Sequence, residues 1–277
     1  MSARLRAVAT STVDILARGG YQSATGDWVD LRAGVERAVT GTRLYLPEQP
    51  LPAAPATDEL VVEVTNESTV EAGRRLGPGT AALVFASARN PGGGFLNGAK
   101  AQEEDIARVS ALYACLTSVP DFYRYHRAHD DLRYSDRVIY SPDVPVFRDG
   151  DLALLDQPFQ LSFLTAAAPN RGAIETSQPD RAPSVPAAVA ARAERVLRIA
   201  AAQGHRTIVL GAWGCGVFAN SPGVVAAAFD AALTHVQAFD RVVFAILDRT
   251  RSGPTYRTFV DALAHRTRPR GNGPERH

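Results

Sequence analysis

Two adjacent glutamates, Glu103 and Glu104, follow a run of three glycines, Gly92–Gly94. Carboxyl groups can bind sugar hydroxyls or exchange a proton with a glycosidic oxygen. Glycines have no Cβ atom, so a ligand can lie against their peptide N–H groups, and a positive φ costs little there. Residues 89–116 therefore have the composition of an active site.

The glutamates lie near the start of a predicted helix, in which apolar residues recur at helical spacing: Ile106, Val109, Leu112, Tyr113 and Leu116. A helix N-terminus can bind phosphate through its free N–H groups. Two carboxylates would repel a phosphate, so their presence indicates a second kind of ligand group, such as sugar hydroxyls. Acidic residues in a first turn also simply complement the helix dipole, and spacing alone leaves both interpretations open.

A second glycine loop is expected at residues 211–220, with Trp213 and Phe218 among three glycines. Like the first loop, it follows a predicted strand and precedes a predicted helix. Ligands of parallel sheets bind at such strand ends, so both loops can converge on one crevice. A tight turn is the alternative, but three glycines with two aromatic residues favour ligand binding.

Neither the cysteines nor the histidines indicate further chemistry. Cys115 and Cys215 make no disulfide framework, and Cys215 has no histidine near it in sequence. His126 and His129 have a spacing that can bind metal, but such polar clusters usually bind nothing. We therefore expect no metal and no cofactor.

The predicted elements alternate between strand and helix after residue 58. This alternation predicts an α/β fold with three α/β/α layers around a mixed, mainly parallel sheet. Strands are expected at residues 59–65, 81–88, 138–147, 159–168, 207–210 and 242–247. The strand at 138–147 contains two prolines, which predict an edge or a broken strand. Helices are expected at residues 69–76, 102–116, 184–202, 222–237 and 255–265, with a polar segment at 120–137.

Three parts of the chain are distinguished by composition. Residues 1–57 are predicted as an accessory segment, with helices at 3–18 and 27–40 and a proline-rich connector at 47–57. Residues 58–266 are predicted as the catalytic domain. Residues 267–277 are rich in arginine, proline and glycine and are predicted as a disordered tail.

The overall composition limits the function classes. Of the 277 residues, 45% are hydrophobic and 21% charged, as in globular proteins, and the net charge is +1. We find no membrane span and no signal peptide, and expect a cytoplasmic protein. The near-neutral charge argues against DNA-specific binding. No Lys-Ser/Thr pair follows a glycine run, which excludes a P-loop nucleotidase.

The first glycine loop and the glutamates resemble the signature of the poly(ADP-ribose) glycohydrolases, in particular the shorter bacterial type built on a macrodomain. The matching pattern is Gly92–Gly94, seven further residues, and then Gln102-Glu103-Glu104. The similarity also reaches residues 140–149, 167–170 and 210–220, so it covers most of the chain from about residue 59 onward. It implies a macrodomain fold for residues 58–266.

The resemblance also implies a role for each site residue. Glu104 would be the proton-transferring residue, Glu103 would bind ribose hydroxyls, and Phe218 would pack over the terminal ribose. The remaining substrate-binding residues would position the ribose or donate N–H groups to the diphosphate: Gln102, Asn97, Gly92, Gly93, Gly94, Gly214, Cys215, Gly216 and Val217. The adenine end is expected near residues 66–71.

These residues predict hydrolysis of ribose–ribose bonds in ADP-ribose polymers. Two adjacent glutamates cannot flank a sugar from opposite sides, so one of them must serve as both acid and base. The low net charge favours attack from chain ends, with release of ADP-ribose. The expected partners are poly(ADP-ribose), ADP-ribose and ADP-ribosylated proteins. A non-catalytic module that binds ADP-ribose is the alternative, but such a reader gains nothing from two carboxylates beside a diphosphate.

Overall fold

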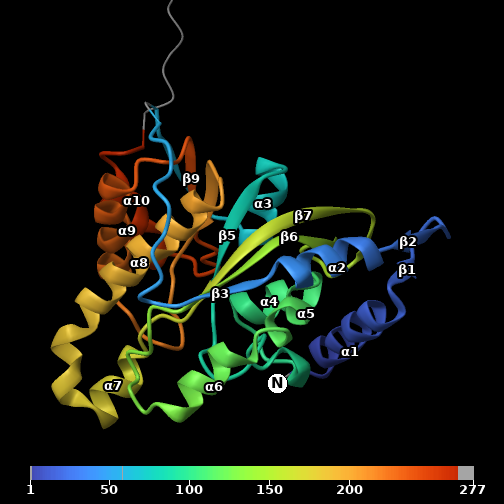
Figure 1. Ribbon diagram of the computed structural model, residues 1–277, viewed down its shortest axis with the longest axis horizontal. Coiled ribbons are helices and arrows are strands. Elements are labelled where there is room, and N and C mark those ends of the chain that lie inside the picture. The colour runs from blue at the N-terminus through green and yellow to red at the C-terminus, as the bar shows by residue number, and fades with distance from the viewer. Residues whose placement is uncertain (1, 58, 268–277) are drawn as a thin grey trace, which may run out of the picture.

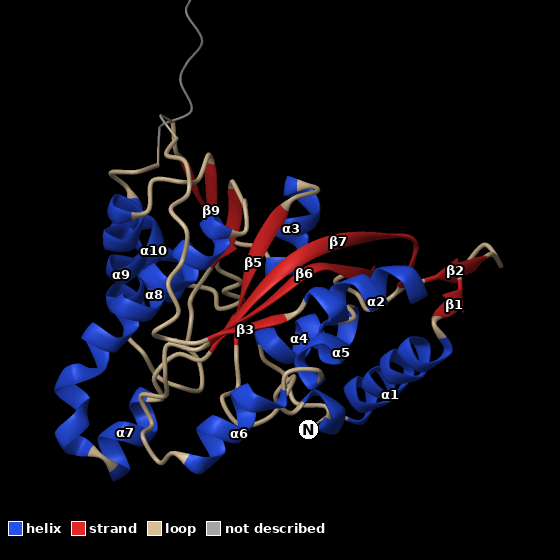
Figure 2. Ribbon diagram, in the orientation of Figure 1, coloured by secondary structure: helices blue, strands red, loops and turns tan. Residues whose placement is uncertain are grey.

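The computed structural model describes residues 2–57 and 59–267. A seven-stranded mixed sheet lies between two layers of helices (Figures 1 and 2), which confirms the predicted α/β architecture. The strand order is β3-β6-β7-β5-β8-β9-β4. The strands are β3 (Arg43–Tyr45), β4 (Val61–Thr65), β5 (Thr80–Phe85), β6 (Val138–Arg148), β7 (Leu154–Ala166), β8 (Thr207–Leu210) and β9 (Arg241–Ala245).

The centre of the sheet is parallel and covered on both faces. The strands from β7 through β5, β8 and β9 to β4 pair in parallel, whereas β6 runs antiparallel to both β3 and β7. Along β5, Ala81 and Leu83 contribute to one hydrophobic core and Ala82 and Val84 to the other. The near-continuous apolar sequence of β5 follows from this burial on two sides.

Two sets of helices enclose these cores. One core is built with α1 (Ala3–Arg18), α2 (Arg32–Gly41), α3 (Thr69–Leu76), α4 (Gln102–Val109), α5 (Leu112–Thr117) and α6 (Pro120–Ala128). The other is built with α7 (Arg171–Ser177), α8 (Val185–Ala202), α9 (Pro222–His235) and α10 (Pro254–Leu263). The short 3₁₀ helices are η1 (Phe95–Asn97) and η2 (Pro179–Ser184). Within the described chain, no helix is long and apolar enough to span a bilayer.

Of the two helices predicted in the first fifty residues, the one at residues 3–18 is confirmed as α1 and the second begins later than predicted. β1 (Gly20–Gln22) and β2 (Trp28–Asp30) form an antiparallel hairpin, so the helix expected from residue 27 begins only at Arg32. Gly26 has a φ of 92° and lies in the hairpin turn. β3 then joins the main sheet beside β6. The domain boundary at residue 57 stays a prediction, and the predicted tail beyond residue 267 lies outside the described residues.

The helix expected over residues 102–116 is wrong as a single element. It is interrupted at Ser110, which is extended and forms a β-bridge with Val146. Ala111 also donates its N–H to the Pro145 carbonyl at 2.9 Å. Because β6 offers backbone partners at this point, the chain leaves the helical ladder for two residues, Ser110 and Ala111, and resumes as α5.

The segment 120–137 and the strand with internal prolines also differ from prediction. The segment contains α6, which begins at a proline, the favoured first helical residue. β6 lies between β3 and β7 and is not an edge strand, but its pairing with β7 shifts register between Ser141 and Val144. β3 pairs only with residues 138–140, so both prolines lie beyond it, where no ladder hydrogen bond to β3 is needed.

Candidate active site

The two glycine loops meet at one end of the sheet. Each follows one of the adjacent parallel strands β5 and β8. A Cβ atom placed on Gly211 would lie 2.8 Å from Cζ of Phe85, so the two strand ends are in contact. A cleft of about 740 Å³ is lined by Phe85 and Gln102 from one side and by Cys215 and Gly216 from the other. Among the described residues, the cleft is lined by the second loop but not by Gly92–Gly94, so the convergence of both loops on one crevice stays a prediction.

The first loop brings both glutamates around Gly93. This residue has a φ of 58°, and a Cβ atom on it would lie 2.4 Å from Oε1 of Glu104 and 3.2 Å from Oε2 of Glu103. Gly92 also has a positive φ, 67°. A side chain at position 93 would thus strain the backbone and collide with a carboxylate, so glycine is required by the carboxylate pair itself.

Glu104 is half-buried in the first turn of α4, and its Oε1 accepts a hydrogen bond of 2.9 Å from the Gly94 N–H. Within the described residues, this is the carboxylate's one hydrogen bond, and Glu104 forms no ion pair. The Gly94 bond fixes the orientation of the carboxylate and leaves Oε2 able to exchange a proton with a ligand.

Glu103 lies deeper and has a different electrostatic state. It is 2% exposed, and its Oε2 accepts a hydrogen bond of 2.6 Å from the Ser87 N–H. Burial, reinforced by the Glu104 charge, raises its pKa well above the ordinary value, although the bonds from Ser87 and Gly92 N–H groups oppose this. Oε1 of Glu103 is buried without a partner among the described residues. A protonated Glu103 places no negative charge beside Glu104.

Gln102 and Asn97 differ sharply in their surroundings. The Gln102 amide accepts from the Phe85 N–H at 2.8 Å and donates to Thr69 Oγ1 at 3.0 Å and to the Leu83 carbonyl at 2.7 Å. Both amide hydrogens are therefore engaged, and Gln102 ties the start of α4 to the end of β5. Asn97 is exposed at the end of η1.

The second loop is shaped by Gly214 and Asn220. Gly214 has a φ of 71°, and a Cβ atom on it would lie 2.6 Å from the Asn220 side chain. That side chain donates to the Pro169 carbonyl at 2.8 Å and to the Gly214 carbonyl at 3.2 Å, which holds the turn. Sequence reasoning missed this role of Asn220, because an asparagine after a loop has no distinctive signature.

The residues between Gly214 and Asn220 differ in how far they are exposed. Gly216 is exposed and has open space around its Cα, and Val217 is 88% exposed. Burial raises the pKa of the Cys215 thiol to about 12, so it is not a nucleophile at neutral pH. Phe218 is partly buried, and its ring lies 6.0 Å from that of Tyr134, measured between centroids.

The two histidines on and after α6 are engaged within the protein. His126 is buried, with Nδ1 hydrogen-bonded to the Phe122 carbonyl and Nε2 to Ser135 Oγ, both at 2.8 Å. Burial lowers the His126 pKa to about 4. His129 bonds to the Tyr125 carbonyl and stacks on the Tyr125 ring.

Further cleft residues come from segments that the sequence did not single out. The turn between β6 and β7, Asp149–Leu152, lines the cleft beside Glu71 of α3, and an Asp-Gly pair was its one signal in the sequence. Asp248, after β9, also lines the cleft and exchanges hydrogen bonds with Asn66. Residues 67–71, within the segment expected at the adenine end, line the same cleft. That assignment stays a prediction.

The fold and the site define an α/β domain in which a carboxylate pair packs against a glycine loop, and a ligand-sized cleft lies beside the same helix. Residues 9–149 match the family model of the microbial-type PARG, catalytic domain. A sequence comparison with curated proteins gives no match. The structural neighbours below agree with the family match, so the chain belongs to the microbial-type PARG family.

Solved structures of bacterial enzymes align over most of the chain. The poly(ADP-ribose) glycohydrolase of Thermomonospora curvata is 45% identical, with a TM-score of 0.89, over 94% of this chain and 100% of that chain. Its structure bound to the inhibitor ADP-HPD is 44% identical, with a TM-score of 0.86, over 94% and 99%. The enzyme of Deinococcus radiodurans in complex with ADP-ribose is 42% identical, with a TM-score of 0.78, over 84% and 98%.

Proposed function

We propose that this protein is a poly(ADP-ribose) glycohydrolase that hydrolyses ribose–ribose O-glycosidic bonds and releases ADP-ribose. The observation that carries this proposal is the approach of Glu103 and Glu104 to Gly93 in a chain of this family. Related bacterial glycohydrolases have been solved with ADP-ribose and with ADP-HPD, which supports the same ligand class here. ADP-ribosylated proteins are the proposed partners, and the cytoplasm the proposed location.

The chemistry follows from the different environments of the two carboxyl groups. Glu104 protonates the leaving ribose oxygen as the glycosidic bond breaks, and the oxocarbenium-like sugar forms. The resulting carboxylate then takes a proton from the water that attacks the same carbon. Glu103, whose pKa is raised by burial, binds a ribose hydroxyl through its unpartnered oxygen. Glu104, which is half-buried and accepts one hydrogen bond, serves in both proton transfers.

The charges around the cleft are mixed. Arg4, Lys100 and Arg249 line it, and none of them forms an ion pair within the described residues. Six acidic residues line it as well: Glu67, Glu71, Asp105, Asp149, Asp151 and Asp248. Glu67 and Asp105 are paired with Arg75 and Arg108 respectively. The cleft as a whole is therefore not positive, and its attraction for an anionic ligand would come from the three cations.

A reader module with the same pocket is the competing proposal. Both proteins would bind ADP-ribose, but only the hydrolase shortens the polymer. Incubation with purified ADP-ribose polymer, followed by chromatography of free ADP-ribose, distinguishes them. Time-dependent release supports the hydrolase, and an unchanged polymer that still binds the protein supports the reader.

A further inference from the structure

Tyr134 has a backbone conformation that its side chain disfavours. Its φ is 61°, in the left-handed region that bulky residues rarely adopt. A strained residue persists only where its surroundings fix it, and such residues cluster at functional sites. The surroundings of Tyr134 are therefore informative.

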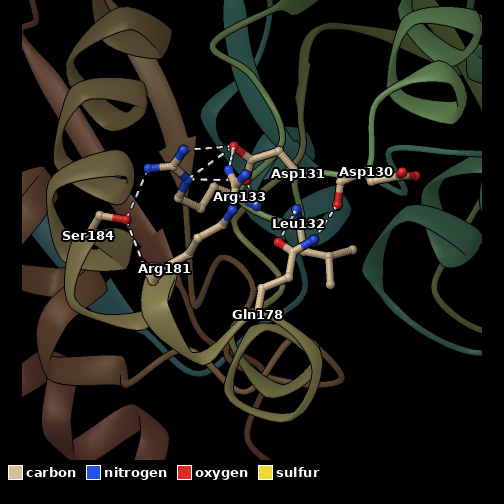
Figure 3. A network of polar contacts seen from close by, with 7 residues as sticks. All are labelled: Asp130, Asp131, Leu132, Arg133, Gln178, Arg181 and Ser184. Atoms are coloured by element: carbon tan, nitrogen blue, oxygen red, sulfur yellow. Dashed lines mark hydrogen bonds and ion pairs between the residues drawn. The ribbon is translucent and has the colours of Figure 1, made fainter.

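The chain just before Tyr134 is fixed by an ionic network (Figure 3). The Asp131 carboxylate forms an ion pair of 2.7 Å with Arg133 and a second one with Arg181. Arg133 also donates to Ser184 Oγ at 3.0 Å, which connects the segment to η2. Hydrogen bonds from Arg133 hold the pKa of Asp131 at about 2, so these contacts persist throughout the neutral range.

Gln178 fixes the same segment from the other side (Figure 3). Its amide oxygen accepts from the Leu132 N–H at 3.1 Å, and its amide nitrogen donates to the Asp130 carbonyl at 2.6 Å. The Leu132 carbonyl in turn accepts from the Asn170 N–H at 2.9 Å. The backbone leading into Tyr134 is thus held by α7 and η2 together.

The Tyr134 ring contacts residues from two different segments. It contacts the Phe218 ring of the second glycine loop, with a centroid separation of 6.0 Å. It also contacts His126 of α6, with a centroid separation of 5.7 Å. The next residue of α6, Arg127, donates to the carbonyl of Arg89, directly before the first glycine loop, at 2.6 Å. Tyr134 therefore connects Phe218, in the second glycine loop, with α6, which in turn holds the chain just before the first glycine loop.

We infer that Tyr134 is a positioning residue of the ribose site, whose ring sets the orientation of Phe218 relative to the carboxylate pair. This inference rests on the proposed function and on the role that the family resemblance implies for Phe218, which is to pack over the terminal ribose. The ring acts on the geometry of the reacting sugar, whereas the rest of ADP-ribose is bound along the cleft. Loss of the ring is thus expected to reduce kcat and to leave affinity nearly unchanged.

The test compares Tyr134→Asn, Tyr134→Phe and Tyr125→Ala with the wild type. Asparagine tolerates the left-handed conformation but lacks the ring, and phenylalanine keeps the ring. Tyr125 is a half-buried aromatic of α6 that contacts His126 but not Phe218, so it controls for loss of a nearby ring. kcat and KM on ADP-ribose polymer, ADP-ribose affinity by calorimetry, and thermal unfolding are measured for each.

The expected result is a drop of about tenfold in kcat for Tyr134→Asn, with KM and ADP-ribose affinity within about threefold of wild type. Tyr134→Phe and Tyr125→Ala should keep wild-type kcat. The inference is overturned if Tyr134→Asn keeps wild-type kcat, if Tyr134→Phe loses as much as Tyr134→Asn, or if the loss falls on KM alone. If the wild type itself releases no ADP-ribose, the proposed function fails instead.

Discussion

Replacement of Glu104 by glutamine tests the proton-transfer role. Glutamine keeps the shape of the side chain, and its amide oxygen can still accept the hydrogen bond that the Gly94 N–H donates at 2.9 Å. Glu104 forms no ion pair among the described residues, so the substitution leaves no cation unpaired. The change is therefore confined to the proton, and we expect stability to stay within about 1 kcal/mol of wild type.

The expected loss of activity is large because one residue serves as acid and then as base. Each role contributes roughly 10²- to 10⁴-fold, so kcat of Glu104→Gln should fall by at least about 10³-fold, or about 4 kcal/mol. ADP-ribose release from polymer measures the rate, and calorimetry with ADP-ribose should show retained binding. Asp105→Asn is the comparison variant, since it removes the charge of an exposed carboxylate one residue away; because it also leaves the buried Arg108 without its ion-pair partner, thermal unfolding is measured beside activity.

Turnover of Glu104→Gln above a tenth of wild type would remove Glu104 from the proton-transfer role. A comparable loss in Asp105→Asn would show that charge in this helix turn matters, and not the particular proton donor. Loss of ADP-ribose binding together with activity would indicate a binding role for Glu104.

Three further substitutions test the surroundings of the carboxylate pair. Phe218→Ala should lower kcat/KM by roughly ten- to a hundredfold, about 1.4 to 2.7 kcal/mol of lost positioning, and an unchanged rate would deny the ring any part in holding the sugar. Gly93→Ala should lose at least about a hundredfold in activity. Gly204 is the control: it has a φ of 82° and open space around it, so Gly204→Ala should lower stability by a similar amount without loss of activity. Equal activity in both variants would contradict the collision with Glu104. The pKa of Glu103 is raised in the folded protein, so its protonated form contributes to the stability of the fold. This stabilisation is complete below the unfolded pKa of about 4.3 and is lost as pH rises through the folded pKa. Glu103→Gln should therefore gain in melting temperature relative to wild type between pH 4.5 and 7.5, and parallel pH profiles would show that Glu103 titrates normally.

The parallel part of the fold could be predicted because burial on two faces leaves a simple mark in the sequence. The strand β8, Thr207–Leu210, is a short apolar run between turn signals, and its predicted bounds were correct; the other parallel strands were found with ends shifted by one or more residues. The break at Ser110 could not be predicted, because nothing in the local sequence opposes a helix there. It depends on β6, which reaches the same point in space from thirty-odd residues away.

In the candidate site, too, the features that depend on segments distant in sequence could not be predicted. The residues that form local patterns, such as Glu103 and Glu104 after the glycines, were found from sequence together with a family resemblance. The raised pKa of Glu103 was not predicted, since it depends on burial that only the folded chain creates. Tyr134 and Asp248 had no local pattern at all, because each reaches the site through contacts with distant segments.

Product analysis at early times tests most directly the claim that this protein removes ADP-ribose from polymer ends. Purified polymer of known length is incubated with the wild type, and samples are separated by length and assayed for free ADP-ribose. The account predicts ADP-ribose as the earliest product, while the remaining polymer shortens gradually. An early burst of long oligomers would show internal cleavage, and a polymer that keeps its length would contradict glycohydrolase activity altogether.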